Sequence, residues 1–105
     1  ASANLAAFLA APHFAANVLA ESQVDLSRRF ASPLPDKFAA GQRSSGLGGV
    51  PVLAGCAAVF ECEKVSSQTA GDHVLFIGQV LAVTEAPVTP LVFQSGHYRM
   101  LGEIL

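Results

Sequence analysis

Residues 71–80 constrain the fold of this chain more than any other stretch. They open with Gly71-Asp72, a pair typical of tight turns, and pass through His73 into an unbroken apolar run at residues 74–77. A short apolar run bounded by turn residues predicts a strand that is buried on both faces. Gly78, inside the same stretch, predicts a bulge or a close approach of two backbones. The chain is therefore expected to build a sheet around this strand.

His73 stands where the turn enters the predicted strand. The residues alone leave two interpretations open. Side chains on loops that a rigid sheet holds are often the ones that carry chemistry. A histidine at a strand start also commonly does no more than hydrogen-bond a backbone carbonyl, and composition alone favours this second interpretation.

The chain has 105 residues, which is enough for one domain. Its hydrophobic content of 51% and charged content of 13% are apolar for a small domain. Two explanations fit: much of the surface meets another subunit, or the chain is part of a larger domain. The formal net charge of −2 gives no basic footprint and argues against nucleic acid as a partner.

The two cysteines are predicted to be reduced. If Cys56 and Cys62 lie on one strand, roughly 20 Å separates them, which is too far for a disulfide. Two free core cysteines are typical of a cytoplasmic protein. The first twenty residues are apolar, but they have no basic start and polar residues interrupt them, which argues against a signal peptide. No segment is long and apolar enough to suggest a membrane span.

Two short helices are expected in the first third of the chain. Apolar residues at helical spacing predict a helix at residues 5–12, closed by Pro12. Ser2 or Asn4 is placed to cap it, and a capped helix start also suits an anion. The second helix is predicted to follow a capping box at residues 22–25 and to run to about Phe30.

Arg28 and Arg29 fall in the last turn of this second helix, where cations suit the helix dipole. Between the helices, residues 14–19 are compact and apolar and predict a strand. Asn17 is the one polar member of that strand. A buried Asn needs hydrogen-bond partners, which either the neighbouring backbone or a ligand can provide.

Turn and alternation signals predict the rest of the chain. The expected elements are a break at residues 32–35, a helical turn at 36–40, a Gly/Ser-rich loop at 41–51, a long strand at 52–66, its partner at 71–84, a short strand at 91–93, a turn at 95–96 and a return strand at 98–101. Successive hairpins without parallel strand–helix–strand alternation favour an antiparallel barrel.

Several sequence motifs are absent. There is no G-x-G-x-x-G motif, so a Rossmann dinucleotide domain is excluded, and there is no P-loop. The three histidines lack metal-ligand spacing, so no metal site is expected. The serines do not stand in a nucleophile elbow.

Seven ordered segments resemble the flavin reductase family, and together they cover nearly all of the chain. They are Phe14-Ala-Ala-Asn17-Val-Leu19, Ser27-Arg-Arg-Phe30-Ala31, Asp36-Lys37-Phe38, Gly55-Cys-Ala-Ala-Val-Phe60-Glu61-Cys62, Gly71-Asp-His73-Val-Leu-Phe-Ile-Gly78-Gln-Val80, Pro90-Leu91-Val-Phe and Gly96-His-Tyr98-Arg.

The resemblance implies a mainly β fold, the antiparallel Greek-key FMN-binding split β-barrel with short helices. It implies NAD(P)H-dependent reduction of FMN or FAD, with NADH or NADPH as hydride donor. Many members of the family supply reduced flavin to a partner monooxygenase, and a homodimer is expected. Family members carry further strands before the segment that matches Ser2. Residues 1–105 are therefore expected to be the C-terminal portion of a single, longer flavin reductase-like domain.

The resemblance also implies roles for particular residues. On the phosphate side of the flavin, Ser2 and Asn4 match a Ser-x-Thr at a helix start, with Asn4 in place of Thr. Lys37 is able to balance the phosphate charge.

On the ring side, Asn17 belongs to a strand beside the flavin, while Phe30 and Ala31 line it. His73 matches a histidine near the flavin ring and the nicotinamide, and Tyr98 matches an aromatic residue near the nicotinamide.

The expected chemistry is hydride transfer from nicotinamide C4 to flavin N5, in which the protein orients two rings and excludes water. His73 is then expected to position the rings. Two other interpretations remain: a flavin-binding split-barrel module without nicotinamide turnover, such as an electron carrier or a storage protein, and a purely structural dimerisation barrel. The Gly71-Asp72-His73 motif favours the reductase.

Overall fold

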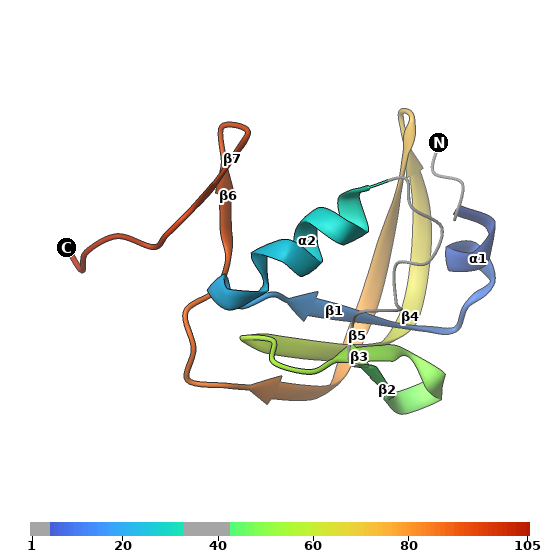
Figure 1. The fold of residues 1–105 in the computed structure, drawn as a ribbon. Coiled ribbons are helices and arrows are strands. Elements are labelled where there is room, and N and C mark those ends of the chain that lie inside the picture. The colour runs from blue at the N-terminus through green and yellow to red at the C-terminus, as the bar shows by residue number, and fades with distance from the viewer. Residues whose placement is uncertain (1–4, 33–42) are drawn as a thin grey trace.

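The structure is a computed structural model that describes residues 5–32 and 43–105. In these residues the chain is mainly β and every sheet is antiparallel (Figure 1), which confirms the predicted class. The Greek-key split barrel stays a prediction. The strands are β1 (His13–Val18), β2 (Arg43–Ser45), β3 (Pro51–Leu53), β4 (Ala58–Ala70), β5 (His73–Glu85), β6 (Val92–Gln94) and β7 (His97–Arg99).

The central sheet has the strand order β1-β4-β5, and two small sheets, β2-β3 and β6-β7, accompany it. Figure 1 shows β4 and β5 as one long twisted hairpin, with β1 beside β4 and the β6–β7 hairpin standing off near one end of α2. The helical elements are α1 (Leu5–Ala10), α2 (Val24–Ala31) and the short 3-10 turns η1 (Glu21–Gln23) and η2 (Leu47–Gly49). None of the helices in the described part of the chain has the length and apolar character needed to cross a membrane.

The β4–β5 hairpin turns at Gly71-Asp72, as predicted. Ala70 pairs with His73 across the turn, and Gly71 has a φ of 63°. A positive φ at this position favours glycine because it has no Cβ to clash with the backbone. The turn residues therefore determine where the longest hairpin of the molecule reverses.

The prediction that residues 74–77 are buried on both faces is wrong. Val74 and Phe76 are half-buried, whereas Leu75 and Ile77 on the opposite face are 54% and 50% exposed. The covered face packs against α1, where the ring centroids of Phe8 and Phe76 lie 6.3 Å apart. A continuous apolar run does not reveal how many faces are covered, because that depends on elements elsewhere in the chain.

The bulge predicted at Gly78 is confirmed, with its extra residue on the facing strand, whereas the close neighbour is the Phe14 side chain and not a second backbone. The pairing passes from Lys64 with Gly78 to Ser66 with Ile77, so one residue of β4 bulges out beside Gly78. A Cβ atom on Gly78 would lie 2.4 Å from Cζ of Phe14. The glycine thus leaves room for the Phe14 ring at this point of the sheet.

The prediction of one long strand at residues 52–66 is wrong, because the structure has two strands there. A turn at Gly55, with a φ of 84°, separates β3 from β4. The predicted loop at residues 41–51 is also wrong in part, because β2, η2 and the start of β3 lie in it. Side chains from elsewhere hold this segment: the Leu47 amide donates to Glu61 Oε1 at 2.9 Å, and Gln23 Nε2 donates to the Ala54 carbonyl at 2.7 Å.

The helices lie close to their predicted positions, but the cap differs. The chain enters a helical turn at η1, before α2 begins, and the Ala20 amide donates to Gln23 Oε1 at 2.8 Å. The predicted capping box at residues 22–25 is therefore wrong, because Gln23 reaches back to Ala20 instead. The second helix ends at Ala31, close to the predicted end at Phe30.

The buried core is small. Leu53, Cys56 and Val59 form a buried cluster, and partly buried apolar residues pack against it: Ala15, Leu19, Leu26, Phe30 and Val52. Cys56 and Cys62 are both buried and free, as predicted. The core thus lies where α2 and β3 meet the central sheet.

Candidate functional site

The residues predicted for the phosphate side cannot be placed. Ser2, Asn4 and Lys37 lie outside the described residues, as does the predicted helical turn at residues 36–40. Their roles stay predictions.

Asn17 uses both ends of its amide on the neighbouring backbone. Its Nδ2 donates to the Pro51 carbonyl at 3.1 Å, and its Oδ1 accepts from the Leu53 amide at 3.0 Å. Of the two kinds of partner that the sequence left open, the structure provides the backbone. Asn17 therefore ties β1 to β3, and its predicted contact with flavin stays a prediction.

Phe30 and Ala31 form the end of α2. The Phe30 side chain is half-buried and packs against the Leu53, Cys56 and Val59 cluster, while Ala31 is exposed. The last turn of α2 therefore offers an anchored ring and a small, accessible side chain next to it. An approaching planar ring would meet apolar carbon there.

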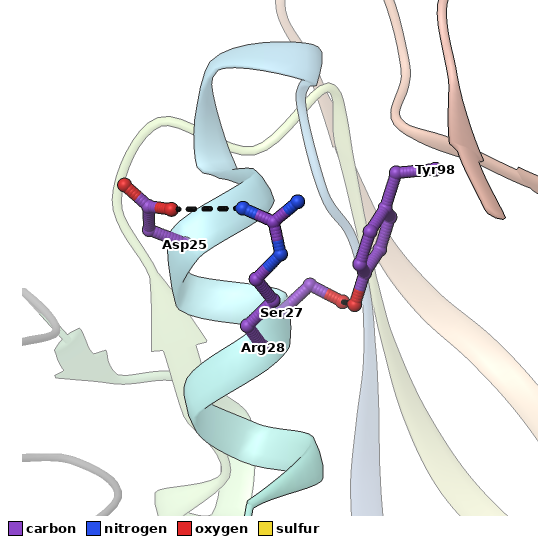
Figure 2. A network of polar contacts seen from close by, with 4 residues as sticks. All are labelled: Asp25, Ser27, Arg28 and Tyr98. Atoms are coloured by element: carbon purple, nitrogen blue, oxygen red, sulfur yellow. Dashed lines mark hydrogen bonds and ion pairs between the residues drawn. The ribbon is translucent and has the colours of Figure 1, made fainter.

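Tyr98 lies in β7 and reaches back to α2, as Figure 2 shows. Its hydroxyl hydrogen-bonds with Ser27 Oγ at 2.8 Å, and Arg28 Cζ lies 5.1 Å from its ring centroid. Arg28 also contacts Asp25 at 3.3 Å, an exposed pair that contributes little to stability. The Phe93 ring meets Tyr98 edge-on at 5.1 Å.

His73 lies at the tip of the β4–β5 hairpin. Its side chain is 85% exposed, and Nε2 lies 3.5 Å from Asp72 Oδ1. The interpretation as a core histidine that serves a backbone carbonyl is wrong, because so exposed a ring is not part of the core. His73 is accessible to a ligand or to another protein surface.

The structure brings part of the predicted site together. Phe30 belongs to α2, and Tyr98 bonds to the same helix through Ser27. Asn17 is linked to Phe30 through Leu53: Asn17 accepts from the Leu53 amide, and Phe30 packs against the cluster that contains Leu53. His73 is not part of this group. Figure 1 shows the tip of the β4–β5 hairpin well apart from β7. Within one chain, the two residues predicted near the nicotinamide therefore belong to two separate hairpins.

Sequence reasoning missed an apolar hollow of about 210 Å³ beside α1 and β1. Its lining consists of aromatic and small side chains with one imidazole: Phe8, Ala11, His13, Phe14, Ala15 and Phe76. His13 Nδ1 is buried without a hydrogen-bond partner among the described residues, and it lies against Gly48. Phe14 and Phe76 come from strands far apart in sequence, so no local sequence pattern predicts the hollow.

Lys64 holds α1 at the edge of this hollow. Its Nζ donates to the carbonyls of Phe8 and Leu9 and lies 5.7 Å from the Phe76 ring centroid. A cation at the carbonyl end of a helix is favoured by the unpaired carbonyls there. Lys64 was not singled out from sequence, because its partners lie in a helix more than fifty residues earlier.

Burial raises the pKa of the Cys56 thiol, and a hydrogen bond from Gln23 opposes this in part. Desolvation disfavours the thiolate, so Cys56 is a poor nucleophile. In the described ranges, no cluster of three or more His, Cys, Asp or Glu side chains is arranged to hold a metal ion.

The residues expected beside the flavin ring have side chains whose polarity suits that ring. Phe30 and Ala31 present apolar surface at the end of α2, and Asn17 and Tyr98 are uncharged. Such surfaces suit the faces of an uncharged planar ring system.

Comparisons with known proteins place these observations in a family. The profile of the flavin reductase like domain matches residues 1–102. The reductase subunit of stachydrine N-demethylase from Rhizobium meliloti is 43% identical over 89 residues, which are 85% of this chain and 39% of that protein. The NADH-dependent FMN reductase of Agrobacterium fabrum is 36% identical over 98 residues, covering 88% of this chain and 52% of that protein.

Among solved structures, the NADH:FAD oxidoreductase of Streptomyces globisporus superimposes with a TM-score of 0.90 at 30% identity, covering 97% of this chain and 64% of that one. The chain spans 39% and 52% of the two curated relatives just described. Since the profile matches almost every residue and the fold agrees, the chain belongs to the flavin reductase like domain family.

Proposed function

We propose that this chain is the C-terminal portion of an NAD(P)H-dependent flavin reductase, which reduces FMN or FAD. The observation that carries the proposal is the family match over residues 1–102. Two similar proteins, named an NADH-dependent FMN reductase and an NADH:FAD oxidoreductase, support flavin and nicotinamide as the cofactors.

The fold proposed for the whole domain is the Greek-key split barrel, with residues 1–105 as its C-terminal portion. The three antiparallel sheets in the described ranges are consistent with this fold. The proposed partner is a flavin-dependent monooxygenase that receives the reduced flavin, since a protein of Mycobacterium tuberculosis that is 41% identical over 93 residues is the reductase subunit of such an enzyme. A homodimer in the cytoplasm completes the proposal, and the free cysteines support the compartment.

The protein contributes binding and orientation to this reaction. When bound, the nicotinamide supplies a hydride and the flavin accepts it. Ser2, Asn4 and Lys37 are proposed to hold the phosphate. Phe30 and Ala31 are proposed to line the ring.

Asn17, by tying β1 to β3, keeps the strand beside the ring in place. Tyr98 is proposed to form a wall on the nicotinamide side.

His73 is proposed to contact the ring pair from the exposed hairpin tip. Its exposure makes it available for such a contact. A positioned side chain of this kind accelerates a reaction by holding reactants in place.

The activity is tested by mixing the purified whole protein with NADH or NADPH and free FMN or FAD in the absence of oxygen. A reductase bleaches the flavin and oxidises one NADH or NADPH for each flavin that is reduced. A flavin-binding module without nicotinamide turnover binds flavin and leaves NADH and NADPH unchanged. A structural barrel does neither, and either of these last two outcomes contradicts the proposal.

His73→Ala is expected to slow hydride transfer about tenfold or more at saturating flavin and NADH. Because the side chain is exposed, the free energy of unfolding should change by less than about 0.5 kcal/mol. Gln68→Ala, at another exposed position of the same hairpin, serves as the matched control. Stopped-flow reduction of both variants is the measurement, and an unchanged rate for His73→Ala removes His73 from the site.

A further inference from the structure

The ring of Tyr98 is held on several sides by residues of its own chain. Its hydroxyl bonds to Ser27 Oγ at 2.8 Å, across a sequence separation of 71 residues. The Arg28 guanidinium lies over the ring, and Phe93 meets it with an interplanar angle of 68°. Figure 2 shows Ser27 and Arg28 reaching Tyr98 from the same side of α2. The tyrosine hydroxyl is therefore directed at α2.

The hairpin that carries Tyr98 is attached to the rest of the molecule at two places. At its base, the Leu91 amide donates to the Leu19 carbonyl and the Glu21 amide to the Thr89 carbonyl, both at 2.8 Å. Beyond the base, the Ser27–Tyr98 hydrogen bond joins β7 to the middle of α2. The two backbone hydrogen bonds at the base leave the hairpin free to pivot there. The Ser27–Tyr98 hydrogen bond, called the latch below, fixes its position on α2.

We propose that Ser27 is a positioning residue for the hydride-donor side of the site, an inference that rests on the proposed function. By bonding to Tyr98, Ser27 fixes the β6–β7 hairpin on α2, the helix whose last turn carries Phe30 and Ala31. The Tyr98 ring then forms part of the nicotinamide side of the site, while its hydroxyl is engaged in the hydrogen bond to Ser27. Losing the latch lets the hairpin leave α2, which lowers the fraction of molecules that are competent to bind the dinucleotide.

The kinetic test compares Ser27→Ala, Tyr98→Phe and the double variant in the whole protein. Each single change removes one side of the same hydrogen bond and should raise KM for NADH by about twofold to tenfold. The double variant should match the singles, because the bond is lost only once. KM for flavin and the rate at saturation should stay the same. Ser27→Thr keeps a hydroxyl and should restore the wild-type KM, while Ser22→Ala, on the exposed surface of η1, is the control.

Two kinetic outcomes overturn the proposal. If Tyr98→Phe raises KM for NADH far more than Ser27→Ala, the hydroxyl contacts the ligand directly. If both variants leave KM unchanged, or raise KM for flavin equally, the latch does not position the hydride-donor side.

Hydrogen exchange tests the latch without turnover. The amides of β6 and β7 should exchange faster in Ser27→Ala and Tyr98→Phe, by the same factor, while those of β4 keep their wild-type rates. Unchanged exchange in β6 and β7 overturns the latch. If the whole wild-type protein does not oxidise NADH or NADPH, the proposed function fails, and the exchange result still decides whether Ser27 and Tyr98 hold the hairpin.

Discussion

The Asn17 side chain provides two hydrogen bonds to the backbone of β3. It accepts from the half-buried Leu53 amide and donates to the Pro51 carbonyl, so β3 depends on it for two hydrogen bonds. Asn is suited to this because its amide carries both a donor and an acceptor. The strand that the sequence marked as a flavin neighbour is therefore also where the β2–β3 segment is anchored.

Asn17→Ala is expected to lower the free energy of unfolding by about 1–3 kcal/mol, since it leaves the Leu53 amide unpaired. Asn17→Asp keeps that acceptor but sets a carboxylate oxygen against the Pro51 carbonyl, so it should recover only part of the loss. Urea unfolding measures both. A variant that keeps full stability but loses flavin affinity would show that Asn17 serves the ligand and not β3.

Cys56 makes the folded state sensitive to high pH. Because its pKa is raised in the folded protein, the unfolded chain loses the thiol proton first as the pH rises. The contribution to stability is complete below the unfolded pKa of about 9.0 and falls as the pH rises from there toward the folded pKa. Alkylation by iodoacetamide at mildly alkaline pH should be much slower in the folded protein than in urea, and equal rates would contradict the burial of this thiol.

At the scale of elements, the β4–β5 hairpin is shaped by the crossing of Phe14 over Gly78. The bulge beside Gly78 and the missing Cβ atom together let an aromatic ring from β1 lie across the sheet. Phe14 there lines the apolar hollow together with Phe76 and with Phe8 of α1. The hollow thus follows from one glycine and one register shift.

Gly78→Ala should destabilise the protein by about 1–3 kcal/mol, because the new methyl group would overlap Phe14. In an open strand the same change would be mildly stabilising. Adding Phe14→Leu should recover part of the loss, and Gly102→Ala, where a Cβ meets nothing within 4 Å, is the control. Thermal unfolding of the wild type, Gly78→Ala, Phe14→Leu, the double variant and the control measures the coupling; strict additivity would mean that Phe14 is not the obstacle.

At the scale of the whole molecule, the chain exposes more surface than its mass predicts. Its accessible surface is 7523 Å², whereas a compact monomer of 10.8 kDa exposes about 5,500 Å². Exposed apolar side chains on both faces of β5, among them Leu75, Ile77 and Val83, belong to this excess. Exposed apolar side chains of this kind suit contact with another subunit or with the rest of a larger domain, the two explanations that the composition left open.

We therefore expect the whole protein to be a homodimer whose interface covers the apolar side chains of β5. A stable dimer buries about 800 Å² per subunit, which is well within the excess. Sedimentation at micromolar concentration should show a dimer, and Ile77→Lys should shift it toward monomer, whereas Ser22→Lys, at an exposed position of η1, should not. A monomer with full activity would contradict both the dimer and this account of the apolar surface.

The sequence by itself determined the features that local chemistry decides. The Gly71-Asp72 turn, the turn at residues 95–96, the strand around Asn17 and the free cysteines are all where the pattern predicted them. Turn residues and apolar spacing act within a few residues, so no distant segment is needed to read them. The family resemblance also came from ordered local motifs and was confirmed by the match over residues 1–102.

Tertiary structure alone decided which faces are covered and which polar groups meet. The second face of β5 is exposed, the predicted strand at residues 52–66 is broken, and Ser27 bonds to Tyr98 across 71 residues. His73, placed beside the rings by resemblance, lies exposed at a hairpin tip away from Tyr98. Each of these depends on contacts between segments far apart in the chain, whose relative positions no local pattern encodes.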